Sequence, residues 1–164
     1  MTAKITIEDR DLGMKQIIAE LTTLAKKKIL VGIQERSKTQ VTYKAGRKGE
    51  ANVDIGEYAT ENEFGTSKIP QRSFIRSSFD ENLSLIEGFI EKKYSEIING
   101  TLTTEHALGE IGRNLERMVK AKIRQIQLPP NTRRTIALKG SSKPLIDFGN
   151  MINAVRFIVK TRKN

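Results

Sequence analysis

Residues 104–127, TEHALGEIGRNLERMVKAKIRQIQ, decide the fold class of this 164-residue chain. Apolar side chains recur in this stretch every three or four residues, which places them on one face of an α-helix. They are Leu108, Ile111, Leu115, Met118, Val119, Ile123 and Ile126. The other face of the same helix is basic and carries Arg113, Arg117, Lys120, Lys122 and Arg124. A long helix with one apolar face must cover a core, and Leu128-Pro129-Pro130 ends it.

A second long helix is predicted just before the first, from 73 to 98. Its apolar positions follow the same helical spacing, and Asn99-Gly100 is a turn signal. The positions are Ile75, Phe79, Leu83, Ile86, Ile90, Tyr94 and Ile97. Ser78 and Glu81 would form a capping box if the helix proper started late. Two long helices joined by a short turn are expected to lie side by side.

Strands are predicted near both ends of the chain. Residues 2–7 and 154–160 alternate between apolar and polar side chains, and 29–33 is a short apolar run typical of a central strand. Between the first two strands, a helix would begin after Asp9 or Asp11 and close at Lys26–Lys28. Shorter helices are expected at 55–63, at 131–138 capped by Asn131, and at 148–152. The sequence therefore predicts a single α+β domain, 1–164, with a small mixed or antiparallel sheet covered by two long helices.

Residues 34–54 differ from the rest of the predicted domain. They are polar and glycine-bearing, with only Val41 and Tyr43 alternating between the polar runs. Long loops in compact domains are uncommon and usually functional or disordered. The segment is expected to be a protruding basic loop or β-hairpin arm that a neighbouring subunit orders.

Charge and composition bound the function classes. The net charge is +10, and residues 111–164 alone carry 13 lysines and arginines against two acidic residues. Such asymmetry suggests a nucleic acid or another acidic surface as partner, although a basic face that only aids solubility is an equal alternative. The chain has no cysteine, which excludes disulfides and thiolate metal sites. No apolar stretch approaches the roughly 20 residues that a membrane helix needs.

The residues that could carry chemistry form no recognisable catalytic, cofactor or metal site. His106, the single histidine, has no cysteine or serine partner near it in the sequence. The acidic residues Glu57, Glu61 and Glu63 lack the spacing of a known ligand set, and solvated helix faces explain them better. Neither glycine-bearing basic stretch, at 46–49 or at 140–144, matches the spacing of a phosphate loop. We therefore expect no catalytic residue, no cofactor and no metal.

Two segments are more specific than any of these features. Residues 62–76, NEFGTSKIPQRSFIR, contain a Glu-Phe-Gly-Thr turn followed by Ile-Pro-x-Arg-x-Phe-hydrophobic-Arg. Residues 138–149, LKGSSKPLIDFG, contain Pro-Leu-hydrophobic-Asp-x-Gly. In order, spacing and flanking elements, the two segments resemble the neck and tail-completion proteins of tailed bacteriophages. The resemblance extends over roughly residues 29–160.

Each motif has an expected physical role in the fold. Gly65 would supply a positive φ, and Pro70 would fix the approach of the chain to the long helix. Phe64 and Phe74 would anchor the junction in the core. The remaining motif residues also have expected partners: Arg72 and Arg76, at a helix start, would need an acid such as Glu63 or a neighbouring subunit, Asp147 would cap the last helix, and Gly149 would allow close packing.

The resemblance implies a structural virion protein at the head–tail junction, assembled in the host cytoplasm. It would form a homo-oligomeric ring, with a hexamer as the expected form, around the DNA channel. Its partners would be other neck proteins, portal-side proteins, and tail-tube or terminator proteins, with non-specific contact to channel DNA and none to a membrane. Arg113, Arg117, Lys120 and Arg124 are the candidate contacts on the basic face. The alternative is a basic nucleic-acid-binding protein that uses residues 111–164.

Overall fold

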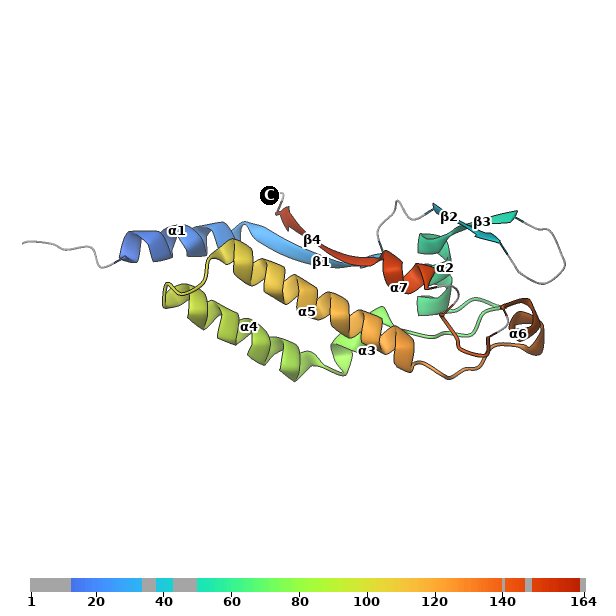
Figure 1. The fold of residues 1–164 in the computed structure, drawn as a ribbon. Coiled ribbons are helices and arrows are strands. Elements are labelled where there is room, and N and C mark those ends of the chain that lie inside the picture. The colour runs from blue at the N-terminus through green and yellow to red at the C-terminus, as the bar shows by residue number, and fades with distance from the viewer. Residues whose placement is uncertain (1–12, 34–37, 43–49, 140, 147–148, 163–164) are drawn as a thin grey trace, which may run out of the picture.

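The computed structural model describes residues 13–33, 38–42, 50–139, 141–146 and 149–162. Within them the chain forms helices and strands in the order α1 Met14–Ala25, β1 Lys27–Ile33, β2 Lys38–Thr42, β3 Glu50–Asp54, α2 Ile55–Phe64, α3 Ile75–Asp80, α4 Leu83–Ile98, α5 Thr104–Gln125, α6 Arg133–Lys139, α7 Asn150–Ala154 and β4 Val155–Thr161. Figure 1 shows three layers: the β1–β4 sheet, then α5, then α4. The predicted α+β class is confirmed.

The sheet joins segments from opposite ends of the chain. Strands β1 and β4 pair antiparallel, with Val31 opposite Phe157 and Leu30 opposite Ile158. These strands confirm the predictions at 29–33 and 154–160. The predicted strand at 2–7 and the predicted caps Asp9 and Asp11 lie outside the described residues. Helix α1 begins after Gly13, which has a φ of 106° and makes no side-chain cap.

Helix α5 is the centre of the fold because it packs against both strands and against α4. The hydroxyl of Thr103 caps its N-terminus by accepting the backbone N–H of His106. The apolar face predicted from spacing is the buried one, with Val119 and Ile123 fully enclosed. At Gly112 the helix meets the ring of Phe157 so closely that a Cβ would overlap it. Glycine at this position therefore sets the distance between α5 and β4.

The prediction of one continuous helix over 73–98 is wrong. The chain forms α3 and α4, separated at Glu81 and Asn82. The Asn82 side chain donates to the Ser78 carbonyl at 2.8 Å. The backbone N–H of Asn82 donates to the Phe79 carbonyl at 3.1 Å and not to the Ser78 carbonyl, which an α-helix would require. The capping box is also wrong, because Ser78 donates to the Ile75 carbonyl and Glu81 pairs with Lys122 on α5 at 2.5 Å. The break lets α3 and α4 contact α5 separately.

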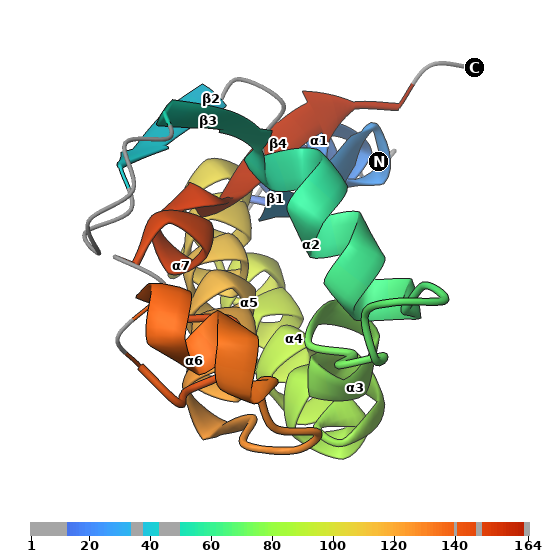
Figure 2. The ribbon, with the colours of Figure 1, turned by 90° about the vertical axis from the view of Figure 1, so that its right-hand side faces the viewer.

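Strands β2 and β3 pair antiparallel, which confirms the two-stranded form of the predicted arm. Residues 34–37 and 43–49 of that arm lie outside the described part of the chain. Figure 2 shows β2 and β3 above α7. The predicted helix near 131–138 is α6, but its cap is Thr132, whose hydroxyl accepts the N–H of Thr135 at 3.2 Å. Asn131 has a different role, described below. Among the described helices, none is long and apolar enough to cross a membrane.

Candidate functional site

The Glu63 carboxylate is the centre of the first motif. Glu63 lies at the end of α2 and is 5% exposed, and its two oxygens point at the start of α3. One oxygen accepts the backbone N–H of Phe74 at 2.7 Å and of Ile75 at 2.9 Å. The other accepts the Ser73 hydroxyl at 2.7 Å and the N–H of Arg76 at 3.0 Å. A side chain from one helix therefore satisfies the free N–H groups of another.

The protonation of Glu63 follows from this arrangement. Burial raises the pKa of the carboxyl group, but the hydrogen bonds from Ile75, Ser73, Arg76 and Phe74 outweigh that effect. The net result is a lowered pKa, so Glu63 is ionised at neutral pH. Of the two expected sources of acid for Arg72 and Arg76, the Glu63 side chain is wrong. It accepts the backbone N–H of Arg76, whose side chain is exposed. An acidic neighbouring subunit stays a prediction.

Gly65 turns the chain away from α2. Its φ of 78° and ψ of 162° confirm the predicted positive φ, in a region that is essentially restricted to glycine. A Cβ there would lie 3.0 Å from the backbone nitrogen of Gln71. Of the two predicted anchors, Phe74 is fully buried, whereas Phe64 is 66% exposed because α2 turns it outward. Pro70 is also exposed.

Arg72 ties this turn to the segment after α5. The side chain is 8% exposed, and its Nε donates to the Pro129 carbonyl at 2.7 Å. The two Nη atoms donate to the Asn62 side chain at 3.1 Å and to the Pro130 carbonyl at 3.0 Å. A planar guanidinium can donate in several fixed directions at once, which lysine cannot do. Arg72 is therefore a structural clasp, enclosed within the chain.

The two motifs form one structural unit. Asn131 accepts a 3.5 Å contact from Arg72 of the first motif and donates to the carbonyls of Ser142 and Lys143 in the second. Phe74 and Leu145 belong to the same buried cluster, at 0% and 1% exposure. Asn131 is thus a bridge between the motifs.

The end of the second motif is described only in part, because Asp147 lies outside the described residues. Gly149 precedes α7 with a φ of 75°. A Cβ at Gly149 would be 3.5 Å from the Asn153 side chain, which is ordinary contact. Its backbone angle, rather than the predicted close packing, explains the glycine.

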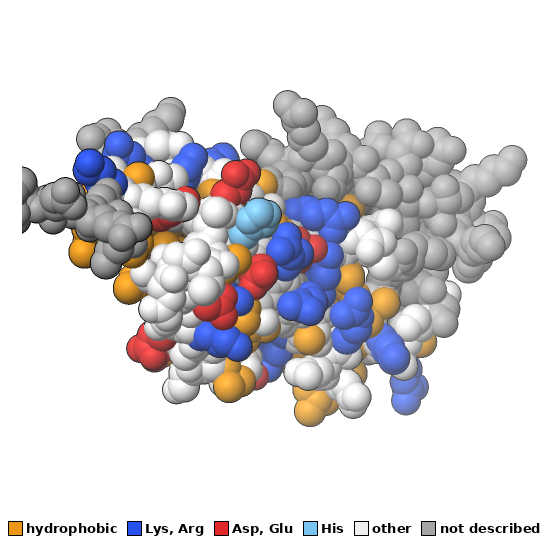
Figure 3. Space-filling model, turned by 60° about the vertical axis from the view of Figure 1, so that its left-hand side comes forward, with side chains coloured by type: hydrophobic (Ala, Val, Ile, Leu, Met, Phe, Trp, Pro, Cys, Tyr) orange, Lys and Arg blue, Asp and Glu red, His pale blue; other side chains and the backbone are white. Residues whose placement is uncertain are grey.

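The basic face of α5 is exposed along most of its length. Arg113, Arg117 and Arg124 point to solvent, whereas Lys120 is half-buried and pairs with Glu116 at 2.5 Å. Figure 3 shows the row of lysine and arginine side chains that includes this face. We call Arg113, Arg117 and Arg124 the basic ridge. Glu116 also accepts the N–H of Phe157 at 3.1 Å, so Lys120 belongs to the α5–β4 contact.

The sequence patterns did not predict three other polar contacts, which join partly buried side chains or backbone groups. Lys93 of α4 is 9% exposed and pairs with Glu110 of α5 at 2.6 Å and with Glu96 at 2.8 Å. These bonds, to Glu110 first, raise the pKa of Lys93. On α1, Glu20 accepts the N–H of Thr104 at 2.7 Å and so caps α5. One signal for the Lys93 contacts was present in the sequence: Lys93 follows Ile86 by seven residues, which places it on the apolar side of the predicted helix, where a lysine needs an acidic partner.

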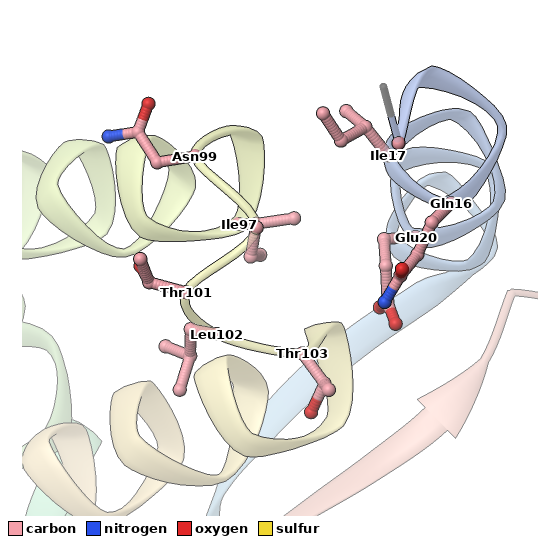
Figure 4. Close-up of a pocket in the computed structure, with 10 residues that line it drawn as sticks. Gln16, Ile17, Glu20, Ile97, Asn99, Thr101, Leu102 and Thr103 are labelled. Carbon is pink, nitrogen blue, oxygen red and sulfur yellow. The ribbon is translucent and has the colours of Figure 1, made fainter. Parts of the chain in front are cut away.

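Two hollows on the described part of the chain are lined by residues that form no recognisable catalytic arrangement. One, of about 260 Å³, lies between α1 and the α4–α5 turn, and Figure 4 shows Ile17 and Ile97 beside it. Another, of about 610 Å³, is lined by His106 and Arg113 beside the sheet. His106 is exposed and its Nδ1 lies 3.0 Å from the Thr103 hydroxyl. In the part of the chain that the structure describes, no group of three or more acidic or histidine side chains could hold a metal.

A scan against protein-family models, a search of curated proteins and a search of solved structures each gave no match.

Proposed function

We propose that this chain is a structural subunit of a ring at the head–tail junction of a tailed bacteriophage. It would close the head-proximal end of the tail or connect the tail to the portal, around the channel through which DNA passes. Its action would be geometric: the subunits present complementary surfaces to the rings above and below. No chemical step and no cofactor are part of the proposal.

The observation that carries the proposal is that the two motifs contact each other in the folded chain. The segments that resemble neck and tail-completion proteins lie far apart in the sequence, yet Arg72 and Asn131 link them. Phe74 and Leu145 then share one core. Residues that belong to one structural unit are expected to occur together in a family. The joint occurrence of both motifs is therefore better support for the resemblance than either motif alone.

Deleting the gene for this protein from the phage tests the proposal. A subunit that completes an assembly acts after its neighbours have formed, so the mutant should make DNA-filled heads and separate tails that do not join. Electron microscopy of lysates and measurement of packaged DNA give the result. Empty heads would assign the protein to DNA packaging, and normal infectious particles would exclude an assembly role.

The second candidate is a basic nucleic-acid-binding protein, and the basic ridge favours it. Arg113, Arg117 and Arg124 follow one face of α5, and exposed cations in a row suit a phosphate backbone. Binding of random DNA by the free protein, weakening steeply with salt, would support this candidate. Co-purification with tails or virions would support the ring.

A further inference from the structure

The three-layer arrangement leaves two faces of the molecule open. Helix α5 lies between the β1–β4 sheet and α4, and it contacts both (Figure 1). One face of the sheet therefore points away from α5, and one flank of α4 is not covered by α5. These two faces cannot meet within one copy of the chain. They can meet between copies.

The outer sheet face combines apolar and basic side chains. The register places Lys28 opposite Lys160, and Leu30 opposite Ile158, on the side away from Phe157 and α5. Leu30 is 41% exposed, and both lysines are exposed. Like charges directly opposite each other destabilise a pair of strands unless an anion comes near. The outer sheet face therefore suits an acidic surface with an apolar centre.

One flank of α4, next to the side that α5 covers, has the opposite charge. Five positions at helical spacing form one stripe along it, and all five are exposed. They are Leu83, Glu87, Glu91, Tyr94 and Ile98. The three apolar members are 42–56% exposed, whereas Ile86 and Ile97 on the adjacent side of the helix are buried. We call this set the α4 stripe.

From this complementarity we infer that the α4 stripe of one copy docks on the outer sheet face of the next. Glu87 and Glu91 would lie against Lys28 and Lys160, with Leu30 in the apolar centre. Because the two surfaces differ, the contact is heterologous and can repeat from copy to copy until a ring closes. Arg156 is a weaker candidate, since its guanidinium already lies 3.6 Å from Glu116. The inference rests on the proposed ring and assigns its subunit contact.

Matched charge reversals in the full chain test the contact. The double variants Glu87→Lys/Glu91→Lys and Lys28→Glu/Lys160→Glu should each abolish assembly, because each opposes like charges. Mixing the two variants should restore it, since every contact in an alternating ring is again between opposite charges. Combining all four changes in one chain should restore it as well. Sedimentation velocity over a concentration series measures assembly, and native mass spectrometry measures the composition.

The matched control is Lys92→Glu, an exposed reversal on α4 outside the stripe, which should assemble like the wild type. Thermal melts check that each variant folds. A wild type that stays monomeric at every concentration would overturn the inference. Assembly that survives both double reversals would also overturn it and point elsewhere, for example to the exposed Met14 and Ile18 of α1.

Three further results would reject the inference, each in favour of another occupant. A mixture that stops at two chains would indicate a contact between like faces. A Lys28→Glu/Lys160→Glu variant with a changed melt but normal assembly would mean that the same chain covers the sheet. If the same variant lost DNA binding but assembled normally, the outer sheet face would be a binding surface for a polyanion. None of these results bears on the gene deletion, so the proposed function can fail or stand separately.

Discussion

The Glu63 carboxylate accepts the backbone N–H of Phe74 at 2.7 Å, across eleven residues of chain. This contact joins the end of α2 to the start of α3 and fixes the turn between them. It also explains why an acidic residue is buried in a basic protein: the free N–H groups of a helix start replace the water that the carboxylate loses.

Replacing Glu63 by alanine should reduce the free energy of unfolding by about 3 kcal/mol, because several buried N–H groups lose their charged acceptor. Urea denaturation measures the change. The matched control is Glu57→Ala on the same helix, an exposed position where a change within about 0.5 kcal/mol is expected. Equal losses in both variants would mean that the Glu63 cap is not important for stability.

The same carboxylate should make stability depend on acid pH. Since its pKa is lowered in the folded state, its contribution is full above the unfolded value of about 4.3 and is lost as the pH falls through the folded value. The wild type should therefore lose more stability between neutral and acid pH than Glu63→Gln, which cannot titrate. Urea denaturation at a series of pH values measures the free energy of unfolding of both proteins. If that free energy fell equally with pH in both, the assignment of the effect to Glu63 would be contradicted.

Two glycines with positive φ should differ in their tolerance of alanine. Gly65→Ala should cost more than about 2 kcal/mol, because the backbone angles are restricted to glycine and the new Cβ meets Gln71. Gly149→Ala should cost about 1 kcal/mol, since only the backbone angle is unfavourable. Gly65→Val should also block head–tail joining through misfolding. Thermal and urea unfolding decide between these values.

Two glycines of α5 should respond in opposite directions. Gly112→Ala should destabilise the protein by about 2 kcal/mol, because its Cβ would overlap the Phe157 ring and push β4 away from α5. Gly109→Ala should stabilise by about 0.5 to 1 kcal/mol, since its Cβ meets only the flexible end of Arg113. Similar changes in stability at both positions would mean that Gly112 does not set the distance between α5 and β4.

The basic ridge and Lys120 should be separable by mutation. Arg113→Glu/Arg117→Glu should weaken joining of tails to heads, and the wild-type contact should weaken with salt, because charges in water are screened within about 8–10 Å. The melting temperature of the Arg113→Glu/Arg117→Glu variant should stay near that of the wild type. Lys120→Glu should instead lower the melting temperature, since it opposes Glu116. A lowered melt for the arginine pair would place those arginines in intramolecular contacts.

Local patterns predicted the elements because each depends on residues three, four or two positions apart. Helix α5 and strands β1 and β4 were found in this way. The break at Glu81 and Asn82 was missed because the apolar spacing continues through it, and the contact that holds Glu81 comes from Lys122 on another helix. Phe64 was misplaced for a similar reason: nothing local showed that α2 turns its last residue outward.

The sequence by itself determined the α+β class, the two motifs and the basic face of α5, since all three follow from residue type and spacing. Only the tertiary structure decided that Glu63 caps a helix, that Arg72 is a clasp, and that Asn131 joins the two motifs. A polar side chain becomes buried only when a distant segment supplies its hydrogen-bond partners. Those partners are set by how the layers pack, which no local spacing encodes.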